Sequence, residues 1–128
     1  MFHYETYEPG KSYGHDRFEM DRERRRLWRD MFPPGGDRMP VALSVLIQQQ
    51  AFTNVITPRA PGHVQGGQSF EFHSLPADDA PLDTEVYCID KEIRRGRQWV
   101  RIGFTCRDGT GQVVFKSVNS VIVPKQSE

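Results

Sequence analysis

Residues 41–54 read VALSVLIQQQAFTN, and this stretch decides the fold. Apolar side chains occupy most of its positions, so the pattern predicts a helix that is buried on most sides. Pro40 suits the first turn of this helix, where a backbone N–H has no partner within the helix. Pro58 and Pro61-Gly62 end the helical region, after which the apolar residues recur with a period of two. One buried helix followed only by strands predicts a sheet wrapped around that helix.

Four strands are predicted after the helix, at residues 63–73, 84–93, 98–107 and 112–123. Gly66-Gly67 indicates a bulge or a close backbone approach in the first of them. Gly96 can take the positive φ that a hairpin turn at residues 94–97 needs. We expect the strands to form an antiparallel meander around the helix, which gives an α+β fold. Because an exposed edge strand is a liability, we also expect two chains to pair as a dimer.

A second helix is predicted earlier in the chain, at residues 22–32, after a short extended segment at residues 13–19. Asp21 can cap this helix through its carboxylate. The apolar face of the helix consists of Leu27, Trp28, Met31 and Phe32. Five arginines occupy much of the remaining surface, and we interpret them as a solvated face rather than a specific anion site.

The composition limits the possible functions. The chain has 128 residues, which predicts one domain spanning residues 1–128. Its 17 basic residues balance its 17 acidic residues, which argues against a nucleic-acid or membrane surface. No apolar run could span a bilayer and the first ten residues contain no apolar signal core, so we expect a cytoplasmic protein. Cys88 and Cys106 lack zinc-ligand spacing, so we expect reduced strand cysteines and neither a metal nor a cofactor.

Seven short segments carry a resemblance that lies in their order along the chain. They are YEPGK at 7–11, GQSFEF at 67–72, LP at 75–76, LDTEV at 82–86, KEIRRG at 91–96, WVRI at 99–102 and DGTGQVV at 108–114. In this order they resemble the MaoC-like acyl-thioester hydratases. That resemblance implies the hotdog fold, in which an antiparallel sheet wraps one long central helix. It also implies an active pocket between the central helix and a dimer partner.

The characteristic motif of that family is only partly present. Its members carry G-D-x-N-P, a hydrophobic residue and H before the central helix, and here residues 36–42 read GDRMPVA. The asparagine is replaced by Met39 and the histidine by Ala42. In the family the aspartate and the histidine together activate a water and move a proton at the α-carbon of the thioester. Asp37 matches the first of these residues, whereas Ala42 supplies no proton chemistry, so the dyad is incomplete.

Asp37 and His63 are the catalytic candidates. Asp37 either caps the buried helix or acts as a base, and an exposed aspartate alone is a poor base for water. His63 is either a partly exposed loop histidine or an acid or base that has moved to a new position. Gly35 and Gly36 are expected to bind the substrate, because N–H groups at the start of a helix can stabilise a developing enolate oxygen.

Arg94, Arg95 and Arg97 cluster at a predicted hairpin tip. Guanidinium groups match phosphate geometry, so the cluster either clamps the phosphates of coenzyme A or forms a solvated turn. Of the three glutamines at residues 48–50, we expect at least two to face solvent or a partner. One of them is then able to face inward and contact a ligand carbonyl.

Three functions are compatible with this sequence. The first is a MaoC-like enoyl-thioester hydratase or dehydratase with a degenerate catalytic motif. The second is a non-catalytic hotdog subunit that binds an acyl group or pairs with an active partner. The third is a hotdog thioesterase, for which Asp37 is the candidate carboxylate. In each case the expected ligand is an acyl-CoA or acyl-carrier thioester, and the assembly is a homodimer or a heteromer with another hotdog chain.

Overall fold

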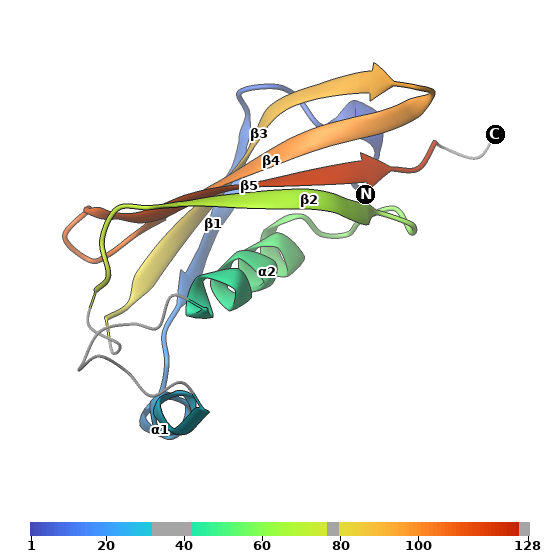
Figure 1. Cartoon of the computed structure of the whole chain (residues 1–128). Coiled ribbons are helices and arrows are strands. Elements are labelled where there is room, and N and C mark those ends of the chain that lie inside the picture. Colours follow the sequence, from blue (N-terminus) through green and yellow to red (C-terminus); the bar gives the residue numbers. More distant parts are fainter. Residues whose placement is uncertain (32–41, 77–79, 126–128) are drawn as a thin grey trace.

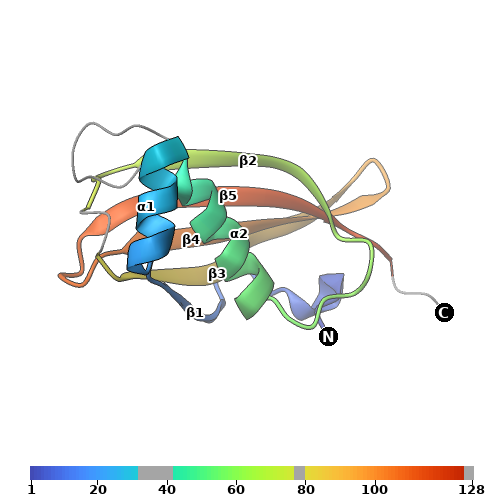
Figure 2. The same ribbon diagram turned by 90° about the horizontal axis from the view of Figure 1, so that it is seen from below.

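A computed structural model describes residues 1–31, 42–76 and 80–125 of the chain (Figure 1). Its elements are a 3-10 helix at Tyr4–Thr6, β1 at Ser12–Phe18, α1 at Arg22–Met31, α2 at Leu43–Val55, β2 at Val64–Phe72, β3 at Leu82–Arg94, β4 at Arg97–Arg107 and β5 at Val113–Val123. The five strands form one antiparallel sheet, and α2 lies across one of its faces (Figures 1 and 2). The predicted α+β arrangement of a sheet around a helix is confirmed. None of the described helices is long and apolar enough to cross a membrane.

The strand order in the sheet is β1-β3-β4-β5-β2. Strands β3, β4 and β5 form the predicted meander, but β2 pairs with β5 and not with β3. The prediction of a simple four-strand meander is therefore wrong, because β1 occupies the other edge of β3. Alternating polarity indicates which side chains of a strand face the core, and it does not indicate which strand lies beside it. The result is that β2 forms an edge of the sheet.

Two backbone features shape the end of the sheet that carries the β3–β4 turn. Arg95 and Gly96 have φ values of 52° and 76°, which are the positive values that a tight two-residue hairpin turn requires. Strand β2 is bulged at Gly66, which lies against the indole of Trp99. A Cβ atom on Gly66 would be 2.5 Å from Cζ3 of Trp99, so any larger residue would have to displace the indole. This position is both a bulge and a close backbone approach, as the sequence predicted.

Helix α2 packs onto the sheet through one side. Its buried residues are Leu43, Ser44, Ile47, Gln48 and Ala51. Val45, on another side of the helix, is 40% exposed. The expectation that this helix is buried on most sides is wrong, because the sheet covers only one of its faces.

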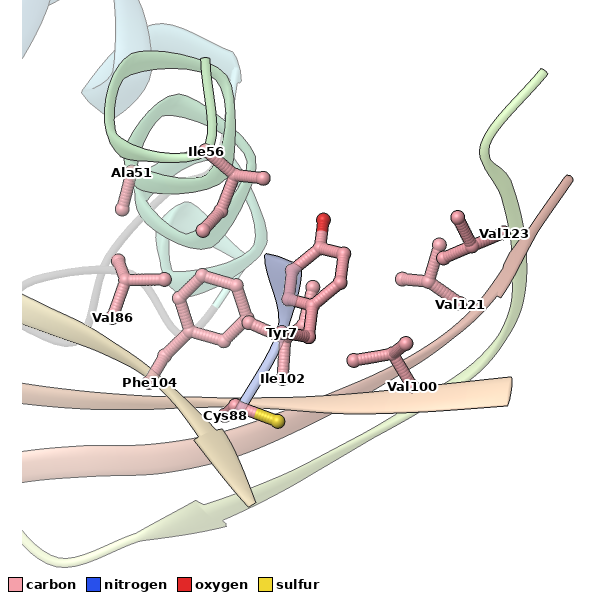
Figure 3. Packing of buried hydrophobic residues seen from close by; sticks show 10 residues of the cluster. All are labelled: Tyr7, Ala51, Ile56, Val86, Cys88, Val100, Ile102, Phe104, Val121 and Val123. Atoms are coloured by element: carbon pink, nitrogen blue, oxygen red, sulfur yellow. The ribbon is translucent and has the colours of Figure 1, made fainter. Parts of the chain in front are cut away.

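An apolar cluster joins the C-terminal half of α2 to the sheet and to the N-terminal segment. The rings of Tyr7 and Phe104 lie between the helix and the strands (Figure 3). Its members are Tyr7, Ala51, Ile56, Val86, Cys88, Val100, Ile102, Phe104, Val121 and Val123. We refer to this group as the first cluster.

A second cluster surrounds the start of α2. Its members are Phe18, Met20, Leu43, Ile47, Leu82, Cys106, Val114 and Phe115. Leu82 begins β3 and Cys106 lies near the end of β4. The start of α2 therefore lies at the opposite end of these strands from the β3–β4 turn (Figure 2).

Both cysteines are buried and free. Burial raises the pKa of Cys88, and it raises the pKa of Cys106 to about 11. A thiol with a raised pKa carries little thiolate near neutral pH and is a poor nucleophile. Both lie on strands, Cys88 on β3 and Cys106 on β4, as predicted.

Helix α1 begins after Asp21, as predicted. The N–H of Arg24 donates to Oδ1 of Asp21 over 2.7 Å, which caps the helix. Leu27 and Met31, two residues of the predicted apolar face of α1, are 55% and 66% exposed. Figure 1 shows α1 on the side of α2 that faces away from the sheet. That all 128 residues form one domain stays a prediction.

Candidate functional site

The start of α2 is the first element of the candidate site. Ala42 precedes the helix and has no side-chain oxygen that could accept a bond from the first-turn N–H groups. The first turn also contains no acidic residue, so the helix itself does not offset the positive end of its dipole. A carbonyl or enolate oxygen is favoured at such a helix end. Gly35, Gly36 and Asp37, the sequence candidates for this place, lie outside the described residues.

Three phenylalanine rings lie near the start of α2. The rings of Phe70 and Phe72 stack with their centroids 6.0 Å apart, and they lie 5.7 and 6.4 Å from the ring of Phe115. Phe115 belongs to the same cluster as Leu43, the first residue of α2. Phe72 is 43% exposed, so part of this aromatic surface is open to solvent. Such a surface suits the apolar chain of a ligand or a side chain of a partner.

A group of polar side chains lies between α2, β5 and β2. Gln48, Ser117 and Asn119 are buried, with 0%, 3% and 2% of their surface exposed. Asn119 of β5 is the cross-strand neighbour of Gln68 of β2, and Nε2 of Gln48 donates to Oε1 of Gln68 over 3.0 Å. We refer to these four residues as the polar row. Gln48 is the inward-facing glutamine that the sequence allowed.

Sequence reasoning missed Ser117 and Asn119. The signal was present, because both are polar residues at positions of β5 that alternate with outward-facing ones and share a face with the buried Phe115 and Val121. A polar residue at an inward position is a candidate for binding, since a buried polar group needs a partner.

His63 lies beyond the other end of α2, immediately before β2. Its Nδ1 is 2.8 Å from the carbonyl oxygen of Ala60, and its Nε2 is 3.1 Å from the hydroxyl of Tyr7. The carbonyl can only accept, so the proton is on Nδ1 and the Tyr7 hydroxyl donates to Nε2. Burial lowers the pKa of His63, which favours this neutral ring. Helix α2 has 13 residues and spans about 20 Å, so it separates His63 from its own start. The catalytic role of His63 stays a prediction.

Arg94, Arg95 and Arg97 are exposed at the tip of the β3–β4 hairpin. With Trp99 they line a surface pocket of about 600 Å³. The Arg94 guanidinium lies 4.7 Å from the centre of the Trp99 ring and 3.6 Å from the carboxylate of Glu92. Arg95 and Arg97 have no acidic partner among the described residues, so the tip can bind an anion. Within one chain, however, this tip and the start of α2 lie at opposite ends of the sheet (Figure 2).

Strand β2 is exposed on both faces along almost its whole length. One edge of β2 bonds to β5, and no other described strand pairs with the opposite edge. Exposed Val64 and Phe72 stand at the two ends of the strand. An unpaired edge of this kind is a place where another chain can add a strand.

Titratable groups elsewhere in the described chain form surface pairs. Nδ1 of His15 is 2.7 Å from Oδ2 of Asp83, and Arg101 binds Asp90 through two nitrogens. The hydrogen bond from Arg101 lowers the pKa of Asp90. Over residues 1–31, 42–76 and 80–125, no three His, Cys, Asp or Glu side chains are grouped so that they could hold a metal ion.

No model of a known protein family matches the chain, and no curated protein matches its sequence. Solved structures match it closely in three dimensions. The MaoC-like dehydratase from Rhodospirillum rubrum has a TM-score of 0.85 against this chain over 100% of both chains, at 15% sequence identity. The chain has a hotdog fold.

Two further solved structures have a similar fold. The HadBC (3R)-hydroxyacyl-ACP dehydratase complex from Mycobacterium tuberculosis has a TM-score of 0.67 at 19% identity, over 87% of this chain and 92% of that chain. A hypothetical protein from Staphylococcus aureus in complex with CoA has a TM-score of 0.66 at 9% identity, over 90% of this chain and 71% of that chain. These likenesses confirm the predicted MaoC-like hotdog fold, and at such identities they concern the fold alone.

Proposed function

We propose that this hotdog chain binds an acyl thioester at the start of α2 and is of the MaoC-like hydratase or dehydratase type, with a degenerate catalytic motif. The observation that carries the proposal is the start of α2, where Ala42 offers no capping oxygen and the first turn no acidic residue, beside the partly exposed rings of Phe70 and Phe72. The helix end suits the thioester oxygen, and the rings suit the acyl chain. The start of the helix and the aromatic surface thus match the two chemically different parts of one ligand.

The proposed chemistry starts from the thioester carbonyl. Backbone N–H groups at the start of α2 would donate to its oxygen and stabilise the enolate that forms when water adds to the β-carbon, or when the α-proton is removed in the reverse reaction. Gly35 and Gly36 are proposed to let the ligand approach this helix end closely. Hydration also needs a base for the water and an acid for the carbon. Asp37 is the proposed carboxylate for this work, and Ala42 stands where the resemblance implies a histidine.

A non-catalytic subunit is the second candidate, and Ala42 is the observation that favours it. A methyl group cannot move a proton, so an active partner chain would have to supply the missing acid or base. A dehydratase of this fold from Mycobacterium tuberculosis is a complex, HadBC. We propose that this chain pairs through the open edge of β2, either with a second copy or with another hotdog chain. A thioesterase activity would depend on Asp37 alone.

The open edge also gives the arginines a proposed role. If the β2 strands of two chains pair antiparallel, the two sheets join with opposite ends side by side. The β3–β4 tip of one chain then lies at the same end of the joined sheet as the start of α2 in the other chain. Arg94, Arg95 and Arg97 would then bind the phosphates of coenzyme A in the site of the partner chain. The cytoplasmic location expected from the sequence stays a prediction.

The test uses the full chain, purified alone, and crotonyl-CoA. Titration calorimetry measures binding, and the loss of enoyl-thioester absorbance measures hydration. We expect binding with little or no hydration, because the acid–base pair is incomplete. Ala42→His should raise the hydration rate by about a hundredfold, since one placed acid or base gives at least that much.

Two variants control this experiment. Adding Asp37→Asn to the Ala42→His chain should remove the gain, whereas adding Asp30→Asn, on exposed α1, should preserve it. Failure of crotonyl-CoA to bind to the wild-type chain, alone or with an active hotdog partner, would contradict the proposed function. Fast hydration by the wild-type chain alone would contradict the non-catalytic alternative.

A further inference from the structure

Three residues of the polar row have buried atoms without a hydrogen-bond partner in the described chain. The atoms are Oε1 of Gln48, Oγ of Ser117 and Oδ1 of Asn119. Buried polar groups in proteins are nearly always paired, because an unpaired group has lost its bonds to water without replacement. Three such atoms in one place indicate a site that a water molecule or a ligand group can complete.

The three residues lie close together although they are far apart in the sequence. Ser117 and Asn119 are two residues apart on β5, so their side chains share one face of the sheet. Asn119 is opposite Gln68, which accepts a bond from Gln48. Ser117 is opposite Phe70, one of the rings near the start of α2. The polar row therefore continues from the aromatic surface in the direction away from the helix start.

The polar row lies where the distal part of a bound acyl chain would reach. Gln48 is five residues after Leu43, which places it about 7.5 Å along the helix axis from the start of α2. A thioester held at the helix start would have its reacting carbons there and its later carbons along the phenylalanine rings. The end of a short acyl chain would then reach Gln48, Ser117 and Asn119.

We propose that the polar row recognises a hydroxyl group on the distal part of the acyl chain, so that the substrate is a short acyl thioester hydroxylated beyond its reacting carbons. This inference rests on the proposed binding of a thioester at the start of α2. It makes Gln48, Ser117 and Asn119 specificity-determining residues.

A hydroxyl group fits the row better than the alternatives. It both donates and accepts, so it can bond to an amide oxygen, an amide nitrogen or the Ser117 hydroxyl, however the amides of Gln48 and Asn119 are turned. A carboxylate only accepts, and the row contains no lysine or arginine to balance its charge. An alkyl end would leave the buried polar atoms unpaired, which a site of this kind rejects strongly.

Gln68 provides a way for a ligand to enter. It lies on the exposed edge strand β2, and its long side chain is the partner that ties Gln48 to that strand. Rotation of the Gln68 side chain into solvent breaks its hydrogen bond with Gln48 and frees Nε2 of Gln48. A bound hydroxyl would replace the lost bond.

The experiment compares two probes on the full chain, hexanoyl-CoA and its analogue with a hydroxyl at the far end of the six-carbon chain. Titration calorimetry gives both dissociation constants. We expect the wild-type chain to bind the hydroxylated probe about tenfold more tightly, the effect of one well-placed hydrogen bond. Asn119→Leu and Ser117→Ala should each reduce this preference to about twofold or less, because each removes a bonding partner.

Matched controls come from neighbouring residues of the same types. Ser120→Ala alters β5 on the face away from α2, and Gln49→Leu alters a glutamine that is not fully buried. Both variants should keep the tenfold preference. Thermal unfolding checks the fold, and we expect Asn119→Leu and Ser117→Ala to melt at the wild-type temperature or above, because each removes an unpaired buried group.

The outcomes separate this inference from the proposed function. Equal binding of both probes to the wild-type chain would overturn the role of the polar row and leave the thioester site intact. A preference that survives in both row variants would also overturn it. A lower melting temperature in both row variants, with the preference unchanged, would make these residues structural. Binding of neither probe would overturn the proposed function and this inference with it.

Discussion

The side of α2 that faces β1 differs from the side that faces β2 in how its polar side chains are satisfied. On the β1 side, Asp16 accepts one hydrogen bond from Gln50 over 2.9 Å and another from Asn54 over 3.0 Å, so both carboxylate oxygens are paired. On the β2 side, Gln48 and Asn119 keep unpaired buried oxygens. The first cluster fills the space under the C-terminal half of α2, whereas the inner face of β2 is left exposed.

This difference indicates that one helix serves two purposes. Its β1 side packs against β1 and β3, and the bonds of Gln50 and Asn54 to Asp16 hold the helix on the sheet there. Its β2 side carries open aromatic surface and incomplete hydrogen bonding, which are features of binding sites rather than of stable cores. Changes on the β1 side should therefore reduce stability, and changes on the β2 side should alter binding.

The largest expected effect is on the core. Phe104 is fully buried in the first cluster, so Phe104→Ala should lower the free energy of unfolding by about 3–5 kcal/mol. Phe72→Ala, at the partly exposed ring of β2, should lower it by less than about 1 kcal/mol and weaken the binding of crotonyl-CoA. Urea unfolding and calorimetry measure the two quantities. Equal losses of stability at the two positions would remove the distinction between the packed first cluster and the open aromatic surface.

A smaller effect is expected at the hydrogen bonds that flank α2. Asp16→Ala breaks two bonds to the helix from a partly exposed carboxylate and should lower the free energy of unfolding by about 1 kcal/mol. Gln49→Leu removes the exposed bond to Gln65 on the β2 side. It should change the free energy of unfolding by less than about 0.5 kcal/mol. Urea unfolding of both variants is the measurement. A larger loss for Gln49→Leu would show that the β2 side also fastens the helix.

The smallest expected effect is a pH dependence at the end of α2 where His63 accepts a bond from Tyr7. Burial, and the nearby charge of Arg59, lower the pKa of His63 below its ordinary value of 6.5. Below pH 6.5 the unfolded chain therefore binds a proton that the folded chain resists. The contribution of neutral His63 to the free energy of unfolding is therefore complete above pH 6.5. It is lost as the pH falls through the lowered pKa.

Thermal unfolding at several pH values between 7.5 and 5 measures this contribution. His63→Gln keeps a side chain that can accept from Tyr7 and cannot titrate, so it should lose less stability on acidification than the wild-type chain. Gln49→Leu, which changes no titratable group, is the control and should follow the wild-type curve. Identical acid slopes for the wild-type chain and His63→Gln would mean that His63 titrates alike in the folded and unfolded states.

Much of the fold was predictable from local patterns. The break at Pro58, the alternation through β4 and the glycine at the β3–β4 turn placed the helices and strands to within a few residues. The candidate site was harder to predict, because its parts come from separate elements. Gln48 was recognised as a possible ligand contact, but Ser117 and Asn119 look like ordinary strand residues until α2 is placed over them.

The sequence by itself determined which residues form each element and which side chains face inward, because periodicity reflects the local geometry of helix and strand. Only the tertiary structure decided that β2 pairs with β5 and leaves an open edge, and that the arginine tip and His63 lie far from the start of α2. Only the tertiary structure also joined Gln48 to Ser117 and Asn119 in one row. These are non-local arrangements, and they depend on how the whole core packs rather than on any short stretch of sequence.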